Sequence, residues 1–112
     1  MSSLPPEDTK LVVLAKATRA RTGAAEGAAL RDLDGRTYAG ATVDLASLQV
    51  SALGVAIAMA VASGAKGAEA AVVLTEGEVS PADLDALRDF AGTGVTVHQG
   101  TPAGAVENTL TS

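Results

Sequence analysis

GAALRDLDGRTYAGATV, at residues 27–43, contains two extended runs joined by the tetrapeptide Leu33-Asp34-Gly35-Arg36. An Asp-Gly pair between such runs is a strong short-range hairpin signal. We therefore predict two strands, at residues 26–31 and 37–43. Asp32 and Asp34 flank the turn, and ordinary turn chemistry accounts for both side chains without any functional site.

Helical patterns lie on both sides of this hairpin. Before it, Pro5-Pro6-Glu7-Asp8 is typical of a helix start, and Gly23 can end that helix. After it, residues 48–63 are apolar on every side, which predicts a second, deeply buried helix. A third helix is expected to begin at Ser80-Pro81 and to end at Gly92 or Gly94.

Two more strands complete the predicted fold. Residues 71–74 form a short apolar run between glycines, as expected of a central parallel strand reached by a helical crossover. A last strand is predicted at residues 95–98, and residues 101–112 are expected to be a loosely held tail. The element order α-β-β-α-β-α-β indicates an α/β domain with a mixed sheet and helices on its faces.

Composition limits the classes of partner. The chain has 112 residues, which predicts one domain at residues 1–112, and its net charge of -5 without a basic cluster argues against nucleic acid. It has no cysteine and its start lacks a secretory leader pattern, so we expect a cytoplasmic protein. The strictly apolar stretch 52–62 is too short to cross a membrane. Only 2% of residues are aromatic, so the core is thin and self-association is expected.

One region resembles a known family. Gly27-Ala28-Ala29-Leu30, Asp34-Gly35 and the run from Tyr38 to Ser47 are similar to the VGAAL, DG and YxGxNVExAS segments of homotetrameric, zinc-dependent cytidine deaminases. The resemblance implies a three-layer α/β/α sandwich. It covers roughly residues 8–110 at the level of element order and is strongest at residues 27–47.

The resemblance also implies where catalytic groups would stand. In the family, three side chains hold a zinc ion that activates water, and a glutamate moves protons. The three zinc-ligand positions correspond to Ser51, Ala82 and Asp85, and the glutamate position corresponds to Leu53. Only Asp85 is a competent zinc ligand and Leu53 cannot transfer a proton, so we expect no catalytic residue, no metal and no zinc cofactor.

Substrate-binding positions differ as well. The aromatic residue that packs on the base corresponds to Ala24, and the amide and carboxylate that hold the ribose correspond to Thr42 and Asp44. These three residues predict at most a vestigial nucleoside site.

Three functions follow from the sequence. We expect a non-catalytic cytidine-deaminase-like protein that forms oligomers and acts through macromolecular interaction. The first alternative is an active, zinc-dependent deaminase of pyrimidine nucleosides. The second is a module that binds a small, nucleoside-like ligand in the vestigial cleft near Ala24, Thr42, Asp44 and Ser51 without converting it.

The expected partner is another copy of the chain. A dimer or tetramer is predicted to assemble through the helix that contains Ser51 to Ala62, because the surface of a mostly alanine helix without a polar face must be shielded from water. The family resemblance points to the same helix, which lies near the subunit contacts in its tetramers.

Two other patterns allow a more specific interpretation. His98 could act as a base beside Ser51 or Asp85, although a lone histidine at a strand end is usually a surface or half-buried residue. Asp83 and Asp85, with Glu76 and Glu78, could bind a hard cation, but Asp83 is also an ordinary residue for the first turn of a helix.

Overall fold

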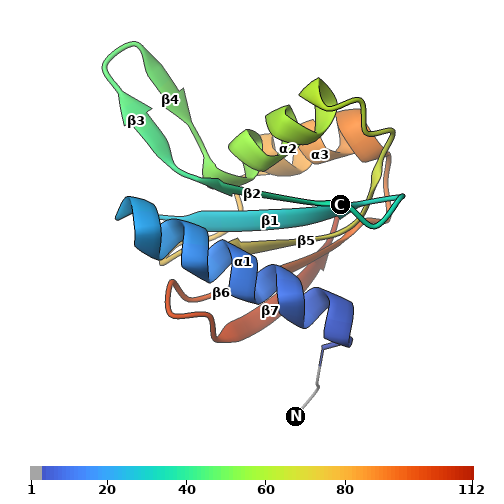
Figure 1. Ribbon diagram of the computed structural model, residues 1–112, viewed down its shortest axis with the longest axis horizontal. Helices are drawn as coiled ribbons and strands as arrows, with labels where there is room; N and C mark the ends of the chain where they lie inside the picture. The colour runs from blue at the N-terminus through green and yellow to red at the C-terminus, as the bar shows by residue number, and fades with distance from the viewer. Residues whose placement is uncertain (1–3) are drawn as a thin grey trace.

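A five-stranded mixed sheet forms the centre of the computed structural model, which describes residues 4–112 (Figure 1). The strand order is β2-β1-β5-β6-β7, in which β5 and β6 run parallel and the other neighbours run antiparallel. The predicted central parallel strand is therefore confirmed. The strands are β1 (Gly27–Asp32), β2 (Thr37–Ala41), β5 (Ala68–Leu74), β6 (Thr96–Gly100) and β7 (Val106–Thr111).

Helices cover both faces of this sheet. Figure 1 shows α1 (Pro6–Thr22) on one face and the pair α2 (Ala52–Ala62) and α3 (Pro81–Ala91) on the other. The predicted α/β fold with three helices is confirmed, and its layers are α/β/α. Among residues 4–112, no helix combines the length and the apolar character that a membrane crossing requires.

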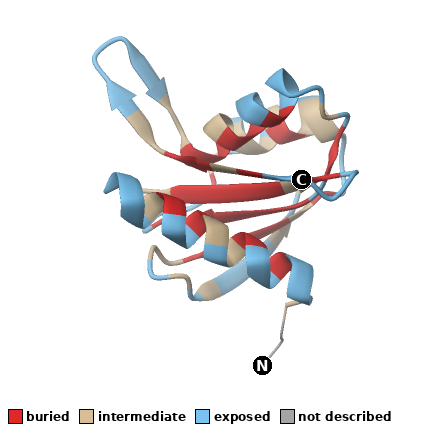
Figure 2. Cartoon of the chain, viewed as in Figure 1, coloured by how far each residue is buried: buried red, intermediate tan, exposed pale blue. Residues whose placement is uncertain are grey.

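Each face of the sheet has its own core. A smaller cluster lies under α1, around Leu11 and Val72, and a larger one lies under α2 and α3, around Leu53 and Leu87. The side chains of these four residues are almost fully buried, and Figure 2 shows the buried positions concentrated on the strands and on the inner sides of the helices. Much of the remaining core is alanine, so elements must approach closely to exclude water.

The turn of the β1–β2 hairpin forms around Asp32, as the sequence predicts. The Asp32 carboxylate accepts hydrogen bonds from the backbone N–H groups of Asp34 and Arg36 and from the Tyr38 hydroxyl, each at 2.9 Å. Burial alone would raise the pKa of Asp32, but these bonds outweigh it and lower the pKa below its ordinary value. Gly35 supplies the positive φ, 86°, that the turn requires.

Two parts of the structure differ from the sequence prediction. The helix expected from residue 48 begins at Ala52, because Ser51 caps it, and residues before the cap form a second hairpin of β3 (Val43–Leu45) and β4 (Leu48–Val50). This hairpin projects from the body of the protein (Figure 1). The tail expected to be loosely held instead contains β7, which pairs along β6 and turns Leu110 toward the core.

Gly40 of β2 lies close to the backbone of α2. A Cβ atom at Gly40 would lie 2.7 Å from the Ala52 carbonyl oxygen and 2.9 Å from the Ala56 nitrogen, and both are backbone atoms. Gly40→Ala is therefore expected to lower the free energy of unfolding by about 1–3 kcal/mol. Urea denaturation measures this loss. Gly77→Ala is the matched control, since only one atom, at 3.8 Å, lies near its added Cβ; equal stability of the two variants would contradict the prediction.

Candidate functional site

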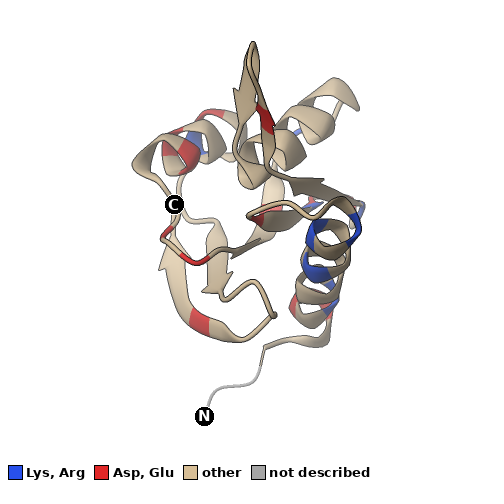
Figure 3. Ribbon diagram, turned by 90° about the vertical axis from the view of Figure 1, so that its left-hand side faces the viewer, with Lys and Arg blue, Asp and Glu red and all other residues tan. Residues whose placement is uncertain are grey.

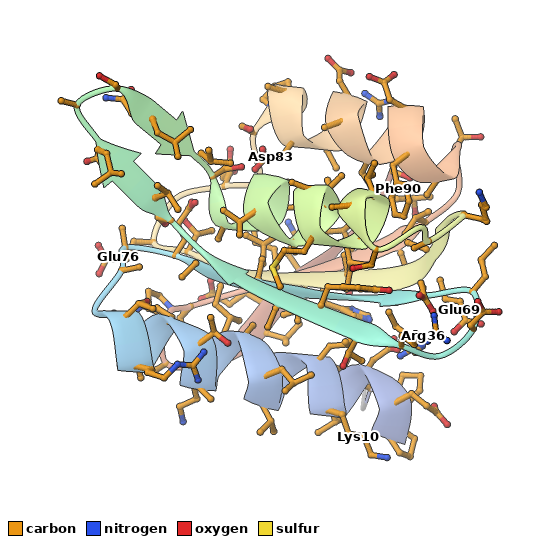
Figure 4. All side chains as sticks on the ribbon, turned by 45° about the horizontal axis from the view of Figure 1, so that its top comes forward. Lys10, Arg36, Glu69, Glu76, Asp83 and Phe90 are labelled. Atoms are coloured by element: carbon orange, nitrogen blue, oxygen red, sulfur yellow. The ribbon has the colours of Figure 1, made fainter. Side chains whose placement is uncertain are left out.

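The N-termini of α2 and α3 meet through two side chains. The Ser51 hydroxyl donates a hydrogen bond of 2.6 Å to Oδ1 of Asp83 and accepts one of 3.0 Å from the Gly54 N–H. Asp83 is held in turn at the start of α3, where its N–H donates to the Ser80 hydroxyl at 3.1 Å. Figure 4 shows Asp83 beside the first turn of α2. The carboxylate therefore stands at two helix N-termini, whose partial positive charge favours it.

The four positions at which the sequence located the family's catalytic groups lie at the starts of two helices that meet, Ser51 and Leu53 on α2 and Ala82 and Asp85 on α3, but their side chains have different surroundings. Leu53 is fully buried in the core between α2 and the sheet, and Ala82 is exposed. The Asp85 side chain is 70% exposed and forms an ion pair with Arg88 of the same helix. Ser51 thus pairs with Asp83 and not with Asp85.

Sequence analysis missed Asp83 as the partner of Ser51. The sequence pointed to Asp83 as a possible cation ligand and as an acidic residue in a first helical turn, and the structure shows the second of these. The Ser80-to-Asp83 spacing is a capping signal, but it contains no information on which other helix will lie alongside. The contact spans 32 residues and depends on how α2 and α3 pack.

The side chains at these positions do not fit a zinc ion. A catalytic zinc site needs three protein ligands with nitrogen, sulfur or carboxylate donors, whereas Ser51 offers a hydroxyl already bonded to Asp83, and Ala82 offers none. Within residues 4–112, no three His, Asp or Glu side chains are grouped so that they could hold a metal. Glu76, Glu78, Asp83 and Asp85 are among these residues and form no such group, so the alternative of a hard-cation site gains no support either.

A cavity of about 520 Å³ opens at the same end of the sheet, where α1 and β5 end. Ala24 and Thr42, two of the three positions linked to nucleoside recognition, line it, while Asp44 lies exposed on β3 outside it. The Thr42 hydroxyl is used within the chain, since it accepts a hydrogen bond of 3.0 Å from the Glu26 N–H. The vestigial site predicted from the sequence is therefore divided, with Ala24 and Thr42 in the cavity and Asp44 outside it.

Charged side chains also line this cavity, and sequence analysis did not find them. Arg19 comes from the last turns of α1, Glu26 precedes β1, and Glu76 follows β5. Figure 3 faces this end of the molecule and shows basic positions along α1 with acidic positions on the segments across from it. Figure 4 shows Glu76 at the same end as Asp83, opposite the end that carries Lys10 and Arg36.

His98 lies on the other face of the sheet from Ser51 and is buried, whereas its strand-end position suggested a surface or half-buried residue. Its Nε2 is 2.8 Å from Oδ2 of Asp8 in α1, and its Nδ1 is 3.0 Å from the Thr109 hydroxyl in β7. Arg31 of β1 lies 3.0 Å from the other Asp8 oxygen. Every polar atom of the imidazole is thus satisfied internally, and His98 does not reach Ser51 or Asp85.

Known proteins resemble this chain over nearly its whole length. A family model described as cytidine deaminase-like matches residues 4–104. The structure is similar to cytidine deaminase from Burkholderia pseudomallei, with 26% identity, a TM-score of 0.77 and coverage of 91% of this chain and 90% of that one. Cytidine deaminase from Mycobacterium leprae gives 22% identity, a TM-score of 0.74 and coverage of 96% and 94%. No curated protein matches the sequence.

Proposed function

Since this chain belongs to the cytidine deaminase-like family, we propose that it is a non-catalytic member that assembles with copies of itself and acts by binding another macromolecule. The single observation that carries the proposal is the place of Leu53. The resemblance assigns this position to the proton-shuttling glutamate, and here its side chain is aliphatic and completely buried in the core. A leucine neither holds nor releases a proton, so the hydrolytic step has no acid or base there.

The Ser51–Asp83 bond supports the same proposal. Ser51 stands at one of the zinc-ligand positions and Asp83 lies between the other two, and their hydrogen bond joins two helix N-termini. A hydroxyl-to-carboxylate hydrogen bond is among the stronger kinds, and it satisfies both groups without a metal. The local chemistry therefore favours a structural role at this position.

Exposed apolar side chains support the proposed assembly. Leu45 and Leu48 on the β3–β4 hairpin and Met59 and Val61 on α2 are all between 43% and 61% exposed. Figure 1 shows that the hairpin and α2 lie on the same side of the sheet. Apolar side chains grouped on one side mark an interaction surface. We propose that a second copy covers it, in a dimer or tetramer.

The purified protein is expected to contain no stoichiometric zinc and to leave cytidine and deoxycytidine unchanged. Elemental analysis after dialysis against a chelator and the absorbance of cytidine measure the two outcomes. About one zinc per chain, together with turnover that Asp85→Ala abolishes, would establish the alternative of an active deaminase. Light scattering on the same sample tests assembly, for which the expected mass is two or four times 11.0 kDa.

A second candidate function is a module that binds a small ligand. The observation in its favour is the cavity of about 520 Å³ lined by Ala24 and Thr42, a volume within the usual range for ligand pockets. Cytidine is the first compound to test, by isothermal titration calorimetry, because the family resemblance points to nucleosides. Heat of binding without turnover supports this candidate.

A further inference from the structure

The cavity between α1 and β5 is lined by more acidic than basic side chains. One cation, Arg19, and two carboxylates, Glu26 and Glu76, line it from three different segments of the chain. None of the three belongs to any of the ion pairs found among residues 4–112. Each charge therefore remains available to a group that enters the cavity.

Arg19 also has a hydrogen-bond donor without a partner within residues 4–112. This donor, the Nε atom, is buried. That atom is closed off from the cavity, so a ligand would meet the terminal nitrogens of the guanidinium, and a carboxylate is the acceptor that suits them best. The guanidinium side of the cavity thus favours a carboxylate group.

The two glutamates favour the opposite charge. Glu26 and Glu76 would repel a simple anion such as phosphate, since they outnumber the single arginine. An ammonium group has three donors and a positive charge, which suit two carboxylates. A neutral molecule would leave all three charged groups without a counterpart.

We propose that this cavity binds a small zwitterion of the amino-acid type, with its carboxylate on Arg19 and its ammonium group on Glu26 and Glu76. The inference rests on the second proposal above, that the cavity holds a small ligand, and it gives that ligand its chemical class. The position of the cavity also supports a bound ligand. Ligands of open α/β sheets bind beyond the carboxyl ends of the strands, and the cavity lies where β5 ends. The volume accommodates an ordinary amino acid.

Isothermal titration calorimetry on the full chain tests the proposal. The probes are glycine, L-alanine, L-leucine, L-lysine and L-glutamate, each with its N-acetyl derivative, which lacks the cation, and its carboxamide, which lacks the anion. At least one free amino acid is expected to bind, and both of its derivatives are expected to bind about tenfold more weakly or worse. If no amino acid binds, or if the derivatives bind as well as the parent, the proposal is wrong.

Variants identify the residues that recognise each charge. Arg19→Gln is expected to weaken the free amino acid about tenfold while leaving the carboxamide unaffected, since only the former presents a carboxylate. Glu76→Gln is expected to weaken the parent while sparing the N-acetyl derivative. Arg21→Gln and Glu78→Gln are matched controls on the same segments outside the cavity. Equal losses in a control, or losses for every probe, would indicate a structural effect and overturn the assignment.

Cytidine provides a separate arm of the same experiment. If cytidine binds and no amino acid does, the small-ligand function stands and the zwitterion is excluded. If neither binds, both the small-ligand function and this inference fall, while the zinc and light-scattering measurements still decide the non-catalytic, oligomeric proposal. The two failures are thereby distinguishable.

Discussion

Ala56→Arg is expected to unfold the protomer, whereas Ala58→Arg is expected to leave it folded and to dissociate the assembly. The two positions lie on one helix, but Ala56 is completely buried against β2 and Ala58 is exposed beside Met59. A charge buried without a partner costs several kcal/mol, which is a large part of the stability of a small domain. An exposed arginine costs the protomer little and disrupts only the surface that we propose a second copy covers.

Circular dichroism and light scattering separate these two results. Ala56→Arg is expected to lose the folded signal, while Ala58→Arg keeps it and scatters as a protomer of 11.0 kDa. Ala20→Arg is the matched control, because Ala20 is an exposed alanine of α1 on the opposite face of the sheet. A folded Ala58→Arg variant that keeps the mass of the wild type would exclude α2 from the interface.

Asp8→Ala is expected to cost about 3 kcal/mol or more of unfolding free energy at neutral pH, because it removes one partner from a buried charged network. Asp8 is 6% exposed and bonds both His98 and Arg31. Without it, the imidazole and the guanidinium face one another with no carboxylate between them, although Glu69 still pairs with Arg31 at 2.7 Å. Urea denaturation gives the loss, and Glu7→Ala, one residue earlier and exposed, is the control.

The loss of unfolding free energy in Asp8→Ala is expected to depend on pH. Burial by itself would raise the pKa of Asp8, but hydrogen bonds from His98 and Arg31 more than offset it, so the pKa lies below its ordinary value. A carboxyl group with a lowered pKa stabilises the fold above its unfolded pKa of about 3.9, and that contribution is lost as the pH falls through the folded value. The difference between wild type and Asp8→Ala should therefore shrink below about pH 4. A constant difference down to pH 2 would show that the charge of Asp8 is not what stabilises the network.

The parts of the fold that the sequence predicted are those with local causes. The Asp34-Gly35 turn, the proline starts of α1 and α3 and the apolar run of β5 each depend on neighbours in the chain. The β3–β4 hairpin was missed because Leu48 and Val50 are apolar and lie just before the apolar run of α2. What separates them is the cap at Ser51, a residue with no special pattern around it.

The parts of the site that were missed depend on contacts between segments far apart in the chain. Thr42 and Ala24 were found through the family resemblance, and both line the cavity. Arg19 and Glu76 were not found, since one lies near the end of a helix and the other in a loop 57 positions later, with no motif that links them. Their meeting is a product of strand order, because β1 and β5 are neighbours in the sheet.

The Asp8–His98 contact has a consequence for the order of folding during synthesis. It joins residues 90 positions apart, so the Asp8 carboxylate has only one of its two partners, Arg31, until β6 has been made. At about 5–20 residues per second, a ribosome needs roughly 5–18 s to add those residues. During that interval α1 can pack its apolar side on β1 and later on β5, and Asp8 can pair with Arg31, but the hydrogen bond to His98 cannot form. The nascent protein therefore completes the α1 face of its sheet last, when the final strands are released.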